Sequence, residues 1–217
     1  SKLPEGAIIS KDESIPLEDR LVYSPESLER LKSSFAALLD KHGVLLADEI
    51  AEKLGVPSSD LVFIIPGNAI KSLDGRKYYS TKYLETLVTK IEEILAETLT
   101  TNVEELAKEL NVSVEELIAA VIASTNLVLS HDMSKIYHED FVFNKLAEIS
   151  KQYADIPVDE AANMIGISSD DLLNLVQRWI SEAYVPIRVS YDRTRLAFIG
   201  ELRKFVEIPE PKGLKFE

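Results

Sequence analysis

The chain has 217 residues, 46% of them hydrophobic and 28% charged, and its 24 basic and 37 acidic side chains give a formal net charge of −13. This composition supports a packed core and excludes a disordered chain, and a net field of that sign repels a polyanion such as DNA unless basic residues cluster. The chain has no cysteine, which excludes disulfides, thiolate metal sites and a cysteine nucleophile or thioester intermediate.

Nothing in the sequence indicates a targeting or membrane-spanning segment. No apolar run approaches the roughly 20 residues that a membrane-spanning helix needs, and residues 1–6 lack the apolar core of a signal peptide. We therefore expect a soluble, cytoplasmic protein that does not insert into a membrane.

The two ends of the chain differ in pattern from its middle. Residues 1–23 carry Pro4, Pro16 and scattered charges, which predict an extended N-terminal arm with little helix. Residues 209–217 begin with a Pro-Glu-Pro run, which ends the folded part and predicts a C-terminal tail. Both ends are typical of a fragment of a longer protein.

Three segments between these ends align with one another without gaps. They are residues 48–61, 104–117 and 159–172. A spacing of about 55 residues separates the matching positions, which is typical of a repeated module. Each segment has a central pivot, and the pivots are Gly55, Asn111 and Gly166. Gly and Asn tolerate a left-handed backbone, so each pivot predicts the sharp end of one helix.

The residues around each pivot predict a pair of helices. Pro57, Ser113 and Ser168 follow the pivots by two positions, with acidic residues soon after, which is typical of a helix start. An alanine four residues before each pivot lets two helices cross closely. A helix, a tight turn and a capped second helix form the helix-turn-helix pattern.

Further elements flank each helix pair. Apolar spacing predicts an amphipathic helix before each pair, over about residues 25–41, 81–98 and 140–153. Turn signals predict a hairpin after each pair, at residues 69–80, 127–137 and 185–199. Three helices and a hairpin predict a winged helix, so the expected fold is mainly α with short β-hairpins, arranged as three tandem winged-helix domains.

We expect these domains to cover residues 24–80, 81–139 and 140–208, between the arm at 1–23 and the tail at 209–217. The first is the weakest match, because Pro66-Gly67 cuts its third helix short.

The third helices are poor candidates for reading DNA bases. We expect them over about residues 58–65, 114–124 and 169–182, and together they carry one arginine, Arg178, against six acids. Base reading in the major groove needs Arg, Lys, Asn or Gln at exposed positions, so it is disfavoured here. Residues 117–123 are apolar around most of the helix and must be covered, either by a neighbouring module or by a separate protein.

Positive charge collects in two of the hairpins instead. The candidate partner-binding residues are Lys71, Arg76 and Lys77 in the first hairpin and Arg188, Arg193 and Arg195 in the third. These side chains are either ordinary solvated charges at hairpin tips or a small basic patch for an acidic protein surface or a nucleic-acid backbone.

No catalytic constellation is present in the sequence. There is no phosphate-binding glycine loop, no HExxH and no GxSxG. His131-Asp132 and His138-Glu139-Asp140 are polar positions beside a hairpin, where solvated charge is a simpler explanation than a metal. Acid pairs such as Asp170-Asp171 lie at helix starts, where the helix dipole explains them. We therefore predict no catalytic residue, no cofactor and no metal.

Two stretches resemble the N-terminal half of the E3 ligase scaffold for the ubiquitin-fold modifier. Residues 74–81, Asp-Gly-Arg-Lys-Tyr-Tyr-Ser-Thr, are similar to the junction between wing and helix in an early repeat of that family. Leu127-Val128-Leu129 with the helix to Tyr153 and the helix pair over 158–180 form the second stretch. The arm at 1–23 has no clear counterpart in the family, and the ligase's contacts with its catalytic partners cannot be traced residue by residue.

The resemblance implies a ligase without a catalytic cysteine that holds a charged conjugating enzyme near the target lysine, so that position and orientation supply the rate. It also implies an adaptor that completes a composite winged helix. Subunits of transcription, membrane-remodelling and proteasome-lid complexes share the architecture. Our first hypothesis is therefore a non-catalytic scaffold that binds proteins, and the alternative is a transcription-associated nucleic-acid binder that uses its basic hairpins.

Overall fold

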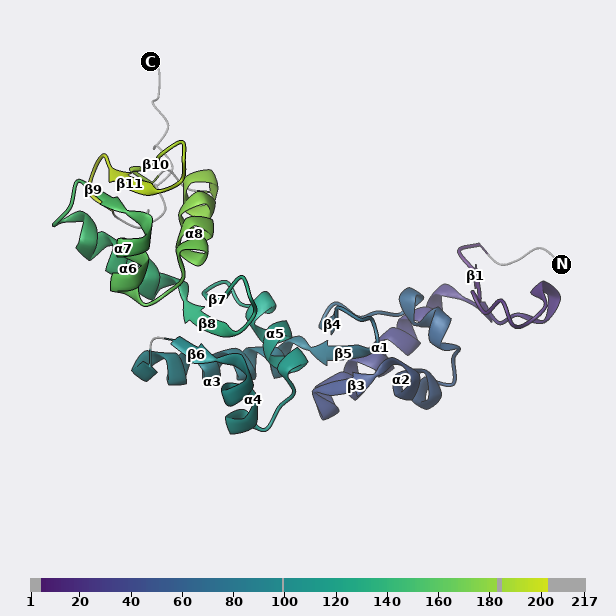
Figure 1. Cartoon of the computed structure of the whole chain (residues 1–217). Coiled ribbons are helices and arrows are strands. Elements are labelled where there is room, and N and C mark those ends of the chain that lie inside the picture. The colour runs from purple at the N-terminus through teal and green to yellow at the C-terminus, as the bar shows by residue number, and fades with distance from the viewer. Residues whose placement is uncertain (1–4, 99, 183–184, 203–217) are drawn as a thin grey trace, which may run out of the picture. The chain divides into compact units, whose positions relative to one another are not determined.

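A computed structural model describes residues 5–98, 100–182 and 185–202, and the predicted C-terminal tail lies outside the described residues. The fold is mainly α-helical with short antiparallel strands (Figure 1). Within the described part, no helix combines the length and apolarity that crossing a membrane requires. The chain divides into two compact units, Ser1–Thr98 with Val103–Leu127 and Leu99–Asn102 with Val128–Glu217.

The first unit opens with a hairpin. Strands β1 (Ile8–Ile9) and β2 (Val22–Tyr23) pair antiparallel, and the loop between them holds a 3-10 turn, η1 (Leu17–Asp19). The segment predicted as an extended arm is thus extended in its strands, but it is folded back on itself and contacts a 3-10 helix at residues 58–63.

A module of helices and a three-stranded sheet follows in the same unit. Its elements are α1 (Pro25–His42), β3 (Val44–Leu46), α2 (Ala47–Leu54), η2 (Ser58–Phe63), β4 (Ala69–Lys71) and β5 (Lys77–Ser80). The sheet order is β3-β5-β4, all antiparallel. Ser24 caps α1 by accepting from the Ser27 N–H. Phe35, Leu39 and Leu61 are buried in the core, where the Phe35 ring meets the edge of Tyr78.

The first unit also contains three further helices, α3 (Thr81–Thr98), α4 (Val103–Leu110) and α5 (Val114–Ala123). Helices α3 and α5 pack together. Leu84, Ile91, Leu106 and Leu117 are almost fully buried, as the predicted amphipathic spacing requires.

The second unit holds two sheets. Strands β6 (Thr100–Asn102), β7 (Leu127–Leu129) and β8 (Lys135–His138) form one in the order β6-β8-β7. Helices α6 (Glu139–Ser150), α7 (Val158–Ile165) and α8 (Ser169–Glu182) follow, with β9 (Asp155–Pro157), β10 (Ile187–Val189) and β11 (Arg195–Phe198) in the order β10-β11-β9 (Figure 1). Their core includes Leu146, Leu172 and Val176, and the Phe143 ring meets Trp179 edge-on.

The pivots behave as their sequence predicts. Gly55 and Gly166 end α2 and α7 in the left-handed conformation, with φ of 68° and 89°. Asn111 takes the same role after α4 with φ of 53°. The predicted hydroxyl cap at Ser113 accepts from the Glu116 N–H. The repeat is therefore a repeat of backbone conformation as well as of sequence.

The predicted helices and hairpins are confirmed, with two differences. The third helix of the first module is only the 3-10 helix η2, because Pro66-Gly67 follows it. Strands β3, β6 and β9 were not predicted; each immediately precedes a helix and is not joined to its partner strand by a turn that the sequence signals.

Candidate functional site

One turn occurs four times in the chain, and sequence analysis did not single it out. Each copy is a serine and an aspartate separated by one residue, in Ser10-Lys11-Asp12, Ser72-Leu73-Asp74, Ser130-His131-Asp132 and Ser190-Tyr191-Asp192. The copies lie in hairpin A (residues 8–23), hairpin B (69–80), hairpin C (127–138) and hairpin D (187–198). All four copies are visible in the sequence. The first copy lies in residues 1–23, which we treated as an arm outside the three repeated modules, so the recurrence was missed.

The turn is held together by the aspartate. In hairpins B, C and D the serine hydroxyl donates to the aspartate Oδ1 at 2.6 Å. The N–H two residues after the aspartate donates to the same oxygen in all four hairpins, over 3.0–3.3 Å. These are side-chain turns that fix the hairpin tip. Donation by the Ser130 hydroxyl, with help from Ser134, lowers the pKa of Asp132 to about 2.

Hairpin A docks on the start of η2. The Lys11 N–H donates to Asp60 Oδ1 at 2.7 Å, and the Tyr23 hydroxyl donates to Asp60 Oδ2 at 2.8 Å. The Lys11 ammonium lies 5.0 Å from the centre of the Phe63 ring. Asp60 is 2% exposed, so this carboxylate is buried and satisfied by a backbone N–H and a tyrosine of the hairpin.

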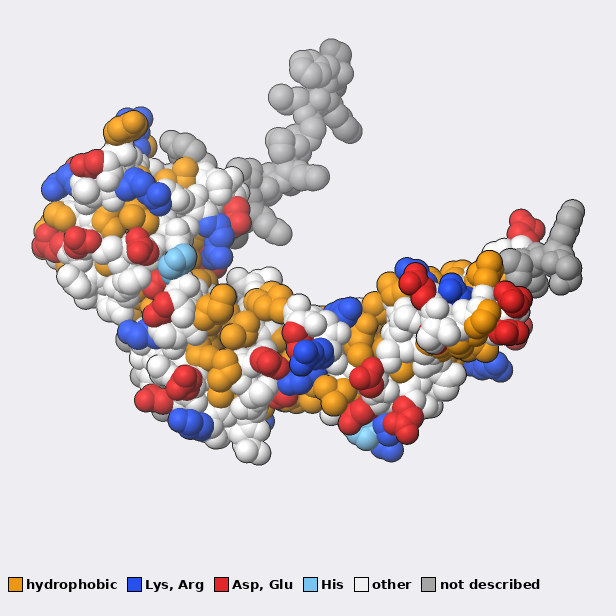
Figure 2. Space-filling model, turned by 45° about the vertical axis from the view of Figure 1, so that its right-hand side comes forward, with side chains coloured by type: hydrophobic (Ala, Val, Ile, Leu, Met, Phe, Trp, Pro, Cys, Tyr) orange, Lys and Arg blue, Asp and Glu red, His pale blue; other side chains and the backbone are white. Residues whose placement is uncertain are grey.

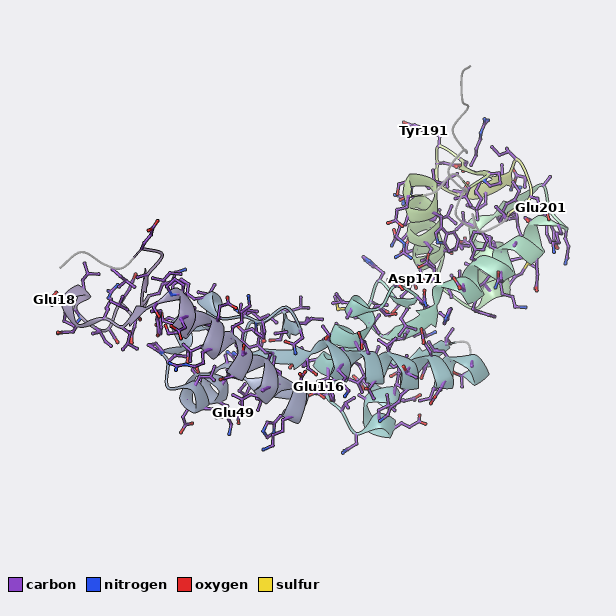
Figure 3. All side chains as sticks on the ribbon, turned by 180° about the vertical axis from the view of Figure 1, so that it is seen from behind. Glu18, Glu49, Glu116, Asp171, Tyr191 and Glu201 are labelled. Atoms are coloured by element: carbon purple, nitrogen blue, oxygen red, sulfur yellow. The ribbon has the colours of Figure 1, made fainter. Side chains whose placement is uncertain are left out.

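Hairpin C docks on the start of α8 with the same chemistry. The His131 N–H donates to Asp171 Oδ1 at 2.7 Å, and the Tyr137 hydroxyl donates to Asp171 Oδ2 at 3.2 Å. The capping residue Ser168 also donates to Asp171 Oδ2 at 2.6 Å. Figure 3 labels Asp171 at this junction. The helix dipole alone therefore does not explain the aspartate at position 171. The Asp171 carboxylate also accepts a hydrogen bond from His131, in a hairpin 40 residues earlier in the chain.

Burial by these contacts raises the pKa of both docking tyrosines. Desolvation is the main cause for Tyr23 and for Tyr137, and the neighbouring carboxylate adds to it. Both hydroxyls thus stay protonated at neutral pH and remain hydrogen-bond donors.

Hairpin B meets α5 differently. The residue that aligns with Asp60 and Asp171 is Glu116, and its Oε2 accepts from the Tyr83 hydroxyl at 3.0 Å rather than from the hairpin. Tyr83 lies against Gly43, where a Cβ would come within 2.8 Å of the Tyr83 ring. The hairpin is held instead by Lys77, whose ammonium is 2.8 Å from Glu115 Oε2. We call the Asp60 and Asp171 contacts closed docks and the Glu116 contact the open dock.

Hairpin D has the same turn but docks on no described residue. The side chain of Tyr191 is fully exposed, at 106% relative accessibility, and lies at the hairpin tip (Figure 3). The Tyr191 N–H, which corresponds to the donors at Lys11 and His131, makes no hydrogen bond to a described residue. Ala197 stands where the other hairpins have their docking tyrosine.

The six predicted partner-binding residues divide between two hairpins and do not form one patch. Lys77 pairs with Glu115, and Arg195 pairs with Asp155 of β9. Arg76 is largely exposed and lies 3.9 Å from Asp74. Lys71 lies over the Tyr78 ring, at 5.9 Å from its centre. Arg188 and Arg193 form no ion pair with any described residue.

The surface charge is mixed rather than segregated. On the face shown in Figure 2, blue and red side chains are interspersed. Arg178, the single cation of the third helices, pairs with Glu139 of α6 inside its own module. Among residues 5–98, 100–182 and 185–202, no group of three or more His, Asp or Glu side chains is arranged to hold a metal ion.

Comparison with known proteins bears on the fold alone. No protein-family model matches the chain, and no curated protein matches it. Among solved structures, the chain is similar to that of a bacterial selenocysteine-specific elongation factor, EF-Sec, with a TM-score of 0.55 and 14% identity. The match covers 82% of this chain and 31% of that one, so the chain corresponds to about a third of the elongation factor's length.

Proposed function

We propose that the protein is a tandem winged-helix scaffold that binds other proteins and has no catalytic site of its own. Each module runs through helix, strand, two helices and hairpin, an order that supports the winged-helix assignment. In the first and third modules the buried acid at the start of the third helix is used to hold a hairpin. The third helices of these two modules therefore contact other segments of polypeptide, which favours protein binding over base reading.

Hairpin D is the surface that we assign to a partner. Hairpins A and C use the same turn to hold the carboxylate at the start of a third helix. Within the part of the chain that the structure describes, hairpin D presents the same free N–H at Tyr191, and Arg188 and Arg193 beside it form no ion pair. The partner that fits is a helix with a hydroxyl cap and an acidic residue in its first turn, since arginines complement that charge.

A second copy of this chain fits hairpin D poorly. Asp60 and Asp171 are already taken by hairpins of the same chain, and Glu116 is taken by Tyr83. We therefore place the partner in a different protein or a different module.

The cellular role that we propose is an E3-like component of ubiquitin-fold-modifier conjugation, which rests on the sequence resemblance. A scaffold of this kind acts by raising effective concentration and fixing orientation, and it needs no catalytic group. The absence of cysteine fits this role.

The test is binding of the purified chain to the purified adaptor and conjugating enzyme of that pathway, by biolayer interferometry. The double variant Arg188→Glu with Arg193→Asn should weaken binding by at least about tenfold, because each charge-assisted contact is worth about 1.5–3 kcal/mol. Arg30→Glu is the matched control, an exposed arginine on α1 outside the predicted partner-binding residues. Equal binding by wild type and the double variant would remove hairpin D from the proposal.

A nucleic-acid role is the second candidate, and the same unpaired Arg188 and Arg193 favour it. An electrophoretic shift at low salt, repeated with Arg188→Glu and Arg193→Asn, separates the two. Salt-sensitive DNA or RNA binding that both substitutions abolish, without any protein partner, would support this candidate against the scaffold. Asn is chosen at position 193 because the residue has a positive φ of 60°.

A further inference from the structure

The open dock leaves a cavity between hairpin B and α5, both in the first unit. Its volume is about 360 Å³, within the range of small-molecule sites. Most of its wall is apolar, from Ile70, Leu73, Ile118, Ala119, Ile122 and Ala123. Two of these side chains, Leu73 and Ile122, are 87% and 62% exposed. Large aliphatic side chains that lie together in the open are typical of a surface that binds something.

The lining of the cavity includes two donors that have no acceptor among the described residues. Tyr79 lines the cavity and is fully buried, yet its hydroxyl has no hydrogen-bond partner among the described residues. The Leu73 N–H also makes no hydrogen bond to a described residue. A buried hydroxyl without a partner has lost its hydrogen bonds to water and gained none in return, so such a group calls for an explanation.

The closed docks show what the matching donors bind in hairpins A and C. Tyr79 and Leu73 occupy the hairpin positions that are Tyr23 and Lys11 in hairpin A and Tyr137 and His131 in hairpin C. In both of those hairpins the hydroxyl and the N–H hold the two oxygens of one carboxylate. In hairpin B the chain's own carboxylate, Glu116, does not line the cavity and bonds to Tyr83 instead.

The charges around the cavity permit a carboxylate there. Glu115 is neutralised by Lys77 at 2.8 Å, and Asp74 is held within its turn by Ser72. Lys71 also lines the cavity and forms no ion pair with a described residue. Burial raises the pKa of Tyr79, so its hydroxyl carries its proton at neutral pH and can donate.

We propose that this cavity binds a small apolar monocarboxylic acid. The carboxylate accepts from the Tyr79 hydroxyl and the Leu73 N–H, and the aliphatic or aromatic part lies against Ile118 and Ile122 of α5. This site is separate from hairpin D and does not depend on the proposed scaffold function.

The test is titration of the full chain with octanoate, followed by calorimetry and by NMR of the Leu73 amide and the Ile122 methyl groups. Saturable binding with shifts at both positions is expected. Octan-1-ol, which has no carboxylate, should bind at least about tenfold more weakly, because it cannot accept the two hydrogen bonds as a charged group. Tyr79→Phe should weaken octanoate binding by a similar factor and leave octanol binding unchanged.

Two further variants sharpen the test. Glu116→Asp gives this dock the acid of the closed docks, so the chain's own carboxylate should compete and weaken octanoate binding. Tyr153→Phe is the matched control, an exposed tyrosine outside the cavity, and should bind octanoate as wild type does. Equal affinity for octanoate and octanol, no saturable binding, or shifts confined to other residues would overturn the proposal. A Tyr79→Phe chain that fails to fold would leave the octanol comparison and Glu116→Asp to decide it.

Discussion

Hairpin C on α8 and hairpin B on α5 are built from the same parts and end in different states. Both hairpins have the serine–aspartate turn and a tyrosine seven residues after the serine, and both meet the first turn of a third helix. The helix supplies Asp171 in one case and Glu116 in the other. The longer side chain reaches Tyr83, and the hairpin donors lose their acceptor. A difference of one methylene group thus accompanies the difference between a buried hydrogen-bonded contact and an open cavity.

The comparison also separates two uses of negative charge. Asp171 is 7% exposed and accepts from three groups, whereas its neighbour Asp170 is exposed at the helix start. The first acts as a structural acceptor for a distant hairpin, and the second is an ordinary favourable charge near the helix dipole. An acidic third helix is therefore not in itself a surface for partners.

The largest effect should come from removing the acceptor of a closed dock. Asp171→Ala leaves the Tyr137 hydroxyl and the His131 N–H without a partner, so we expect a loss of about 2–4 kcal/mol in the free energy of unfolding. Urea unfolding followed by the fluorescence of Trp179, the only tryptophan, measures it in the same unit. Asp170→Ala is the control and should change stability by less than about 0.5–1 kcal/mol. Similar losses in both variants would contradict a specific role for Asp171.

Much of this architecture could be predicted from the sequence, because the signals were local. The pivots at Gly55, Asn111 and Gly166 need a left-handed backbone, and the caps follow at a fixed distance. The short strands β3, β6 and β9 were missed because, unlike the equally short β4, β7 and β10, they are not joined to their partner strand by a turn that the sequence signals.

The docking contacts between hairpins and third helices could not be predicted from local sequence signals. The contact of His131 with Asp171 spans 40 residues, and that of Lys11 with Asp60 spans 49. In hairpin B the strand residue Tyr78 faces its own core while Tyr79 faces α5, which follows from strand alternation only once the next module's position is known. The basic hairpins were proposed from charge alone, and the structure divides those residues between ion pairs and exposed positions.

A matched pair of tyrosine variants, one in the closed dock at Asp171 and one in the open dock, should differ in stability by a smaller amount. Tyr137→Phe removes a donor from the buried Asp171 carboxylate, so we expect a loss of about 1–2 kcal/mol. Tyr79→Phe removes a hydroxyl that has no acceptor among the described residues, so the variant's stability should stay equal to wild type or rise slightly. Thermal unfolding of both variants beside wild type measures the difference. An equal loss in the two variants would mean that Tyr79 finds an acceptor in solution and that the second dock is closed.

The smallest effect is expected at the exposed turn of hairpin C. The pKa of Asp132 is lowered from 3.8 to about 2, first by the Ser130 hydroxyl and then by Ser134. Because the folded-state pKa is the lower one, this turn contributes its stability in full above about pH 4 and loses it as the pH falls through about 2. Ser130→Ala should move the Asp132 midpoint toward 3.8, and Ser134→Ala should move it less.

Carbon-detected NMR of the Asp132 carboxyl between pH 1.5 and about 6 measures these midpoints. The matching turn in hairpin D serves as a reference. The pKa of Asp192 is also lowered, mainly by the hydrogen bond from Ser190, and it should be unchanged in both variants. If Ser130→Ala left the Asp132 midpoint near 2, the serine–aspartate contact would not be what lowers that pKa. The turn would then be a product of backbone geometry, and its recurrence in hairpins B, C and D would reflect a shared hairpin shape more than a shared side-chain interaction.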